Sequence, residues 1–355
     1  MAILKIRPDQ DTFITSNSLG ESASFGGDEI LELGACSREG SAGLSRILLY
    51  FPYVRLPEHS DAVVTLNLKC ASAENLPSTY TVTASRPSQH WVDGTGHVQD
   101  IPGVYNGATW EQPNPFSAPD IWWEGGEGGG NRAAVIDNPP LSDCFQHFSR
   151  NDESKDISIE VSSLYPNMYL NRNGILLKFA SKVTDDASDE ELEELGTRLS
   201  FFSRETHTIY APYLEVAYDD SINEASSSLE NLDGVIVGTR NLKEHYYLDE
   251  QVRIDLSVKP EFPVRVFSTS SLYRDLDEAL PEDTLWGIRD EYTGEMVVPF
   301  NYVGTKISYD INNFIILNTS LLEPERYYRL LIKGPSSGGQ RILDTKNIFR
   351  IVRNG

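Results

Sequence analysis

The feature of this sequence that most constrains its fold is a recurrence of short runs of β-branched and aromatic residues. Clusters of Gly, Pro, Asn, Asp and Ser separate the runs, as is typical of strands joined by turns. In residues 63–69, Val64, Leu66 and Leu68 alternate with polar residues, which places one apolar face against a core. The pattern therefore predicts an all-β fold. The first predicted strands are 12–15, 47–51, 62–69, 80–84, 157–161, 175–179, 199–202 and 213–218.

The length of 355 residues favours two domains, since single hydrophobic cores rarely grow beyond a few hundred residues. A polar stretch from Asp219 to Ser228 interrupts the strand pattern and is typical of an interdomain linker. We predict an N-terminal sandwich over residues 1–220, a linker over 221–230 and a C-terminal sandwich over 231–355. The C-terminal strands are predicted at 251–258, 264–267, 285–290, 314–317, 327–333 and 349–352. Short strands at this density fit an immunoglobulin-like sandwich.

Two segments depart from the strand pattern. Residues 188–195 predict a short acidic helix, because Ser188 can cap its first turn and Glu191 completes a capping box. Its carboxylates fit a solvated helix face better than a metal site. Residues 91–140 are dense in Gly, Pro, Trp and Asn and predict a long loop region, which is either functional or packed by its own side chains.

The charge balance excludes one class of partner. Asp and Glu number 53 against 30 Lys and Arg, which gives a net charge of −23. Nucleic-acid affinity comes mainly from clustered cations, so no nucleic-acid partner is expected.

No stretch approaches the ~20 apolar residues of a membrane helix. The N-terminal residues lack the pattern of a secretory signal, so we expect synthesis in a cytoplasm and no membrane partner.

The sequence carries few of the patterns that accompany catalysis. It has no Gly-x-Ser-x-Gly elbow, no phosphate-binding loop and no His-Glu-x-x-His, and its six histidines are scattered. Cys36, Cys70 and Cys144 are widely spaced, which fits buried hydrophobic side chains better than a metal box or a disulfide framework. We therefore expect a protein without enzymatic activity.

Four of the five tryptophans fall within the loop region 91–140. Exposed aromatic faces are the usual platform for stacking against sugar rings, so these residues are candidate carbohydrate-binding residues. Buried tryptophans under a long loop instead fill the core, and this packing interpretation is the commoner one. The sequence leaves both interpretations open. The residues concerned are Trp91, Trp110, Trp122 and Trp123.

Paired aspartates suggest a cation site. Asp9 and Asp11 lie two residues apart at the start of a predicted strand, so their side chains share a face. Ca²⁺ collects carboxylate and carbonyl oxygens, and Asp28 and Asp93 are candidate further ligands. Their spacing is not that of a regular calcium loop, so an exposed or capping role is the alternative. No other cofactor is predicted.

An ordered series of motifs along the first 220 residues resembles the DNRLRE-type β-sandwich domains, which are similar to some carbohydrate-binding modules. The motifs are DTFI (11–14), SRILLYF (45–51), VVTLNL (63–68), HWVDGTG (90–96), ATW (108–110), IEV (159–161), GILLKF (174–179), LSFFSRE (199–205) and APYLEV (211–216). The resemblance implies a jelly-roll-like sandwich of a kind found in cell-surface proteins, polysaccharide-associated proteins and phage virions. The lack of a signal peptide and of a wall anchor favours a virion.

The C-terminal residues give a second resemblance. The stretches LWGIRD (285–290), VPF (298–300), TKISYD (305–310) and LEPERYY (322–328) resemble immunoglobulin-like end domains of structural proteins in contractile-tailed phages. The turn that leads into residues 329–333 resembles a corner that ties one sheet to the next.

Both resemblances imply a non-enzymatic structural or adaptor protein of a tailed-phage virion, at the neck, tail, baseplate or capsid. Sandwich surfaces and strand edges would contact other virion proteins in a symmetric assembly. The alternative is a glycan-binding adhesion module that recognises a host surface. Fold does not establish function, so both stay open at this level.

Overall fold

The computed structural model describes residues 2–16, 23–38, 41–52, 62–87, 89–116, 123, 144–164, 173–180, 196–262 and 278–353. Within these ranges the secondary structure is almost entirely β-strand, and the helix found there is the 3-10 turn η1 (Thr319–Leu321). The predicted all-β fold is confirmed. The predicted helix at 188–195 and the predicted strand at 264–267 lie outside the described residues. No helix in the described part of the chain is long and apolar enough to span a membrane.

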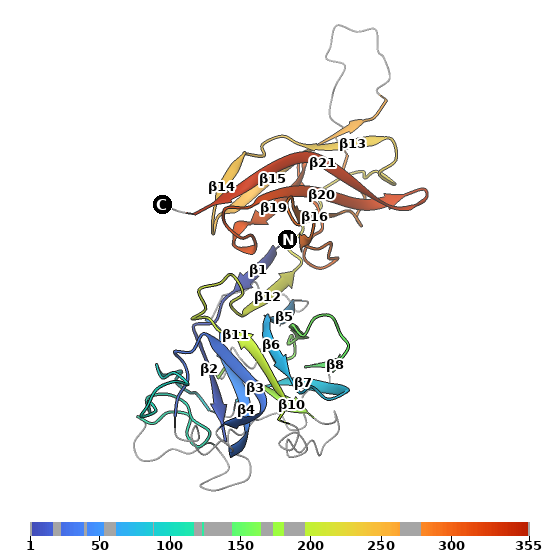
Figure 1. The fold of residues 1–355 in the computed structure, drawn as a ribbon. Helices are drawn as coiled ribbons and strands as arrows, with labels where there is room; N and C mark the ends of the chain where they lie inside the picture. The colour runs from blue at the N-terminus through green and yellow to red at the C-terminus, as the bar shows by residue number, and fades with distance from the viewer. Residues whose placement is uncertain are drawn as a thin grey trace, which may run out of the picture. The chain divides into compact units, whose positions relative to one another are not determined.

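The chain divides into two compact units, coloured mainly blue to green and yellow to red in Figure 1. The N-terminal unit comprises Ile6–Arg55 and Val64–Glu215, and the C-terminal unit comprises Val216–Gly355, Met1–Lys5 and Leu56–Val63. The division after residue 215 is close to the predicted border at 220.

The segment predicted as a linker, 221–230, is bonded to the C-terminal unit. Asn223 forms a β-bridge with Tyr309, and Ser228 forms one with Ala279. The Leu229 N–H also donates to the Ala279 carbonyl, 2.8 Å away. The polar composition of this stretch therefore reflects surface strand pairing, which satisfies its backbone groups.

An eight-stranded sheet forms the main layer of the N-terminal unit. Its order is β6-β11-β3-β4-β10-β7-β8, and β2 also pairs with β4. All seven strand pairings of this sheet are antiparallel. The strands are β2 (Gln10–Thr15), β3 (Ile30–Arg38), β4 (Ser41–Tyr50), β6 (Cys70–Glu74), β7 (Thr79–Ser85), β8 (Phe145–Ser149), β10 (Ile175–Ala180) and β11 (Arg198–Phe202).

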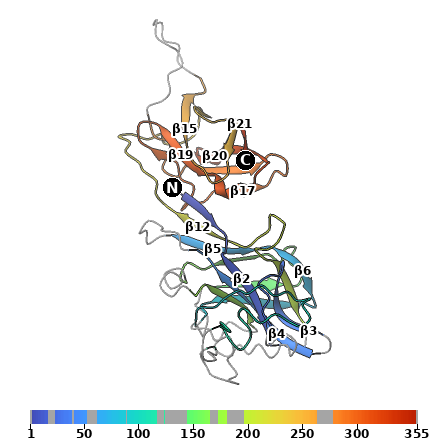
Figure 2. The same ribbon diagram turned by 90° about the vertical axis from the view of Figure 1, so that its left-hand side faces the viewer.

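A second sheet has the order β1-β12-β5-β9, with β1 (Ala2–Ile6), β12 (Tyr213–Tyr218), β5 (Val63–Leu68) and β9 (Ile157–Glu160). Val64, Leu66 and Leu68 are buried, whereas the alternate residues of β5 are half-buried, as the sequence alternation predicts. A single residue separates the end of β5 from the start of β6. One extended stretch therefore contributes β5 to the second sheet and β6 to the eight-stranded sheet (Figure 2). Such sheet-switching strands form the corners of sandwiches.

The Gly- and Trp-rich loop covers one face of the eight-stranded sheet. Ile14, Leu48 and Leu176, from β2, β4 and β10, are fully buried and pack in one cluster with the loop residues. The loop contributes Trp91, Ala108, Trp110 and Trp123. The three tryptophan side chains cover this apolar face, a role that a second sheet or a helix fills in other layered folds.

The C-terminal unit is a β-sandwich of two sheets, with orders β13-β15-β19-β18 and β14-β21-β20-β16-β17. Buried residues of both sheets form one core, which includes Leu256 and Leu317 from the first and Ile288, Leu330 and Ile351 from the second. β14 pairs parallel with β21, and the long β20–β21 hairpin runs across the unit (Figure 1). The strands are β13 (Val235–Thr239), β14 (His245–Tyr247), β15 (Gln251–Pro260), β16 (Leu285–Asp290), β17 (Met296–Val298), β18 (Ser308–Tyr309), β19 (Asn313–Asn318), β20 (Tyr327–Ser336) and β21 (Gly339–Val352).

Tyr328 anchors the turn before residues 329–333, which resembles a corner between two sheets in the sequence. Its side chain is fully buried, and its hydroxyl donates to the Glu323 carbonyl oxygen, 2.8 Å away. Burial raises the pKa of Tyr328, which keeps the hydroxyl protonated as a donor. A tyrosine that bonds to backbone a few residues upstream is a recurrent device of immunoglobulin-like sandwiches.

We predict that Tyr328→Phe destabilises the C-terminal unit by ~1–2 kcal/mol, because the half-buried Glu323 carbonyl loses its donor. Tyr327→Phe is the matched control, since the adjacent Tyr327 side chain is 54% exposed. Urea unfolding of both variants measures the difference. Equal stability of the two variants would contradict a structural role for the Tyr328 hydroxyl.

Candidate functional site

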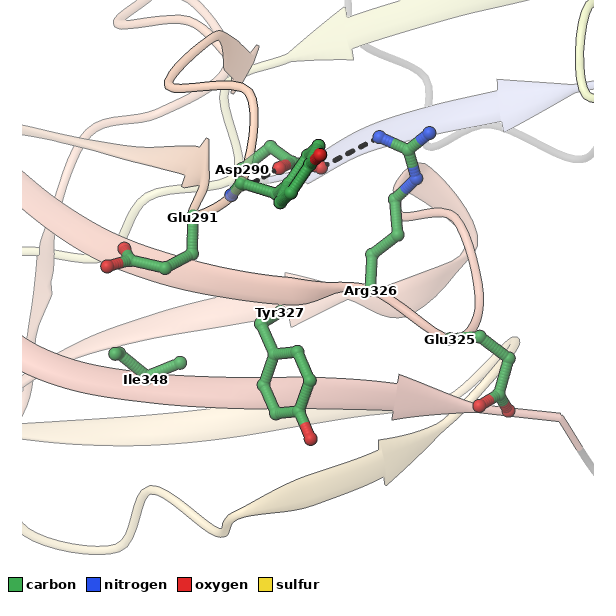
Figure 3. Close-up of a pocket in the computed structure, with 7 residues that line it drawn as sticks. Asp290, Glu291, Glu325, Arg326, Tyr327 and Ile348 are labelled. Atoms are coloured by element: carbon green, nitrogen blue, oxygen red, sulfur yellow. Dashed lines mark hydrogen bonds and ion pairs between the residues drawn. The ribbon is translucent and has the colours of Figure 1, made fainter.

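A surface hollow of about 550 Å³ lies on the C-terminal unit. Its lining comes from the end of β16 and the following turn, from the two residues before β20 and its first residue, and from β21. Because β16 and β20 are antiparallel, with Asp290 opposite Tyr328, these segments meet at one end of the five-stranded sheet. Figure 3 shows the side chains. The lining residues are Asp290, Glu291, Tyr292, Glu325, Arg326, Tyr327 and Ile348.

Asp290 organises the turn beside the hollow. Its side chain is 2% exposed, and its Oδ1 accepts hydrogen bonds from the backbone N–H groups of Tyr292 (2.8 Å) and Thr293 (2.9 Å). Its Oδ2 accepts from Arg326 Nη1 at 2.9 Å, the contact dashed in Figure 3. Burial acts to raise the pKa of Asp290, but these hydrogen bonds outweigh it and lower the pKa below its usual value. The carboxylate thus stays ionised and fixes the turn.

The turn presents exposed apolar groups. Tyr292 is 97% exposed, Tyr327 is 54% exposed and Ile348 is 40% exposed. Tyr327 lies opposite Arg350 and Ile348 lies opposite Arg329, so Tyr327 and Ile348 are diagonal neighbours on the paired strands β20 and β21 (Figure 3). A large aromatic surface therefore stands on hydrogen-bonded backbone and is left open to solvent.

Ion pairs surround these apolar groups. Arg329 donates to both carboxylate oxygens of Glu291, at 2.7 and 2.6 Å, and to Asp344 at 2.9 Å. Arg350 pairs with Glu325 and also lies over the Tyr327 ring, 5.7 Å from its centroid. Surface ion pairs add little to stability. Their effect here is to leave each lining carboxylate with a guanidinium partner around an apolar centre.

This arrangement suits contact with another protein. The centres of protein interfaces are apolar and enriched in aromatic residues, Met and Arg, and a polar rim surrounds them. The most strongly contributing contacts are made by buried aromatic and Arg side chains.

Sequence reasoning missed this hollow. The available signal was a tyrosine in the Tyr292-Thr293-Gly294 turn directly after the predicted strand 285–290, a polar position where an aromatic residue is unusual.

The structure places three of the predicted carbohydrate-binding tryptophans in the core. Trp91 is 1% exposed, Trp110 is 6% exposed and Trp123 is 2% exposed. The Trp91 Nε1 donates to the Asn173 carbonyl at 2.9 Å, and the Trp123 Nε1 donates to the Thr109 carbonyl at 3.0 Å. This burial corresponds to the packing interpretation, and their rings offer no surface platform for sugars. Trp122 lies outside the described residues.

We predict that Trp91→Ala destabilises the N-terminal unit by ~3–5 kcal/mol, because it leaves a large cavity and an unpaired Asn173 carbonyl. Phe116→Ala is the control in the same loop region, since Phe116 is 70% exposed. Its expected effect is within ~0.5 kcal/mol. Thermal unfolding followed by near-ultraviolet circular dichroism distinguishes the two. A tolerated Trp91→Ala would contradict the packing role.

The predicted calcium-binding aspartates are only partly brought together. The side chains of Asp11 and Asp93 both lie beside Arg204, whereas Asp9 is exposed. Arg204 Nη2 lies 3.2 Å from an Asp93 carboxylate oxygen. Asp28 instead accepts from the Val98 N–H at 2.8 Å and lies 3.8 Å from His97 Nδ1.

The cationic group next to the Asp11 and Asp93 carboxylates is therefore the Arg204 guanidinium. Within the described ranges, no three His, Cys, Asp or Glu side chains are grouped so that they could hold a metal ion. A calcium site at Asp9, Asp11, Asp28 and Asp93 stays a prediction. The sequence could not indicate this arginine, because it lies 193 residues from Asp11 along the chain.

Comparisons with known proteins give little similarity. The chain matches no known protein-family model and no curated protein. Among solved structures, it is similar to a DUF4785 family protein from Legionella pneumophila, with 8% identity and a TM-score of 0.19. That similarity covers 97% of this chain and 65% of the other, so the chain spans less than two thirds of that protein's length.

Proposed function

We propose that this chain is a non-enzymatic structural or adaptor protein of a tailed-phage virion, and that it acts through protein–protein contacts. The proposed site of these protein–protein contacts is the hollow, in which exposed Tyr292, Tyr327 and Ile348 are surrounded by paired charges. Placement in a virion rests on the two resemblances in the sequence, one in each half of the chain. Other virion proteins in a symmetric assembly are the proposed partners.

The chemistry of the hollow supports a protein partner. Contact with an apolar partner side chain would release water from the Tyr292 and Tyr327 rings, a gain of roughly 25 cal/mol for each Å² of apolar surface buried. The Glu291–Arg329 and Glu325–Arg350 pairs would then form a rim that excludes water from the centre.

The scaffold of the hollow also favours binding. Tyr327 and Ile348 lie on paired strands, and Asp290 fixes the turn that carries Tyr292. Groups that are already ordered lose little conformational entropy when a partner binds. Sites supported by strands and by buried hydrogen bonds also keep a more constant geometry than free loops.

We predict that phage particles assembled with a chain carrying Tyr292→Ala and Tyr327→Ala contain at least ~10-fold fewer copies of it. That loss corresponds to ~1.4 kcal/mol or more of contact free energy. Tyr302→Ala is the matched control, because Tyr302 lies in the same unit and is 51% exposed. Quantitative mass spectrometry of purified particles counts the copies, and circular dichroism confirms that each variant is folded.

Absence of the wild-type chain from purified particles would refute the virion proposal. Incorporation that is equal for all variants would refute the role of the hollow and leave the virion placement standing. A glycan array with the full chain separates the adhesion alternative. Sugar binding that the Tyr292→Ala and Tyr327→Ala changes abolish would assign the hollow to a glycan instead of a protein.

A further inference from the structure

The N-terminal strand β1 contributes to the core of the C-terminal unit. Met1–Lys5 belongs to this unit, whose longest segment begins only at Val216. The side chains of Ile3 and Lys5 share one face of β1, because strand residues two apart point to the same side. Ile3 is 3% exposed and lies in one core cluster with Ala217. In the described sheet, β1 is an edge strand that pairs with β12.

Ile3 packs closely against the turn that contains Gly304. A Cβ atom on Gly304 would lie 2.7 Å from Ile3 Cγ1 and 3.1 Å from the Ala217 Cβ. A side chain at this position is therefore incompatible with Ile3 in its place. The turn is closed by hydrogen bonds between Asn301 and Thr305, including one from the Thr305 N–H to the Asn301 carbonyl at 2.9 Å. Ile3 thus meets a surface that is shaped to receive it.

Lys5 contacts residues 322–328, which we call the corner segment. Its Nζ lies 3.4 Å from Glu323 Oε1, and the two side chains are only 15% and 19% exposed. The Glu323 carbonyl accepts the hydrogen bond from the Tyr328 hydroxyl. A buried ion pair adds little net stability, but loss of one partner is costly, so such a pair can fix the register of a strand. Lys5 therefore holds β1 in one position on the corner segment.

The corner segment also forms one side of the hollow. It supplies Glu325, Arg326 and Tyr327 to the lining. Its backbone is bonded to β21, because the Glu325 N–H donates to the Ile351 carbonyl at 2.7 Å. The contact of Lys5 with Glu323 lies two residues before Glu325. The N-terminal strand thus contacts the segment that positions the lining of the hollow.

We propose that β1 is a strap that fixes the corner segment and so keeps the hollow in its binding geometry. Ile3 fastens the strap to the Gly304 turn, and Lys5 fastens the corner segment to the strap. The part that concerns binding rests on the proposed function, whereas the strap itself is tested without it. Without the strap, the corner segment opens more often, and a partner must order it on binding.

Hydrogen–deuterium exchange of the full chain tests the strap. Lys5→Ala should raise exchange at the Glu325 amide about tenfold, because the Glu323 carboxylate loses its charged partner. Amides of β15 and β19, in the other sheet of the unit, should keep their wild-type exchange, since the effect is local. Arg7→Ala is the matched control, because Arg7 directly follows β1 and its side chain is exposed.

A pair of substitutions tests the fit of Ile3. Gly304→Ala should raise exchange at the Thr305 amide about tenfold, because its methyl group would overlap Ile3. In an Ile3→Ala background the same substitution should have a smaller effect, since the space is already vacated. Equal effects of Gly304→Ala in the two backgrounds overturn the contact between Ile3 and this turn.

Incorporation into phage particles tests the link from the strap to the hollow. We expect about threefold fewer copies of the Lys5→Ala chain than of the Arg7→Ala chain, because the partner must order the corner segment. Quantitative mass spectrometry of purified particles counts both chains. Raised exchange at Glu325 with unchanged incorporation overturns the link to the hollow.

Failure of the strap is distinguishable from failure of the proposed function. Exchange at Glu325 that is equal in the wild type and in a folded Lys5→Ala variant overturns the strap, whatever the particles contain. Normal incorporation of the chain with Tyr292→Ala and Tyr327→Ala instead refutes binding at the hollow, and the exchange measurements still decide the strap.

Discussion

The N-terminal unit depends on one constraint, which is that both faces of its eight-stranded sheet are apolar and must be kept from water. Phe13 and Ile47 lie on one face, and Ile14, Leu48 and Leu176 lie on the other. Among the residues that the structure describes, no sheet covers the second face. A loop covers it instead, and tryptophans supply the volume that regular structure would otherwise provide. The position of this loop in turn brings Asp93 to Arg204 and so creates the charged cluster at Asp11.

The C-terminal unit also contains a buried carboxylate, Asp290, but this one has more hydrogen-bond donors than Asp11 has. Asp290 accepts two backbone N–H groups and one guanidinium, so its charge is satisfied and its turn is rigid. Asp11 accepts a single backbone N–H, from Arg204, and the guanidinium of that arginine pairs with Asp93 and Glu205. The number of donors therefore separates the two buried carboxylates: three donors lower the pKa of Asp290, whereas burial with one donor raises that of Asp11.

The sequence predicted the features that local pattern determines. Alternation in 63–69 located β5, because a side-chain period of two directly encodes a half-buried strand. It could not decide whether Trp91 was a platform or a core residue, since both use the same side chain and differ only in what covers it. It also could not place Met1–Lys5 with the C-terminal unit, or Tyr327 beside Ile348, because these depend on pairing between distant strands. The hollow, and Arg204 beside Asp11 and Asp93, were missed for that reason.

The parallel pairing of β14 with β21 has a consequence for synthesis on the ribosome. His245 pairs with Arg350, and Tyr247 pairs with Val352. β14 therefore emerges about a hundred residues before the strand it pairs with, a separation that slows pairing through loop closure. All strands of the eight-stranded sheet, in contrast, precede residue 203. The order of translation thus lets the N-terminal sheet close first, while the five-stranded sheet that carries the hollow is completed only after its last strand is released.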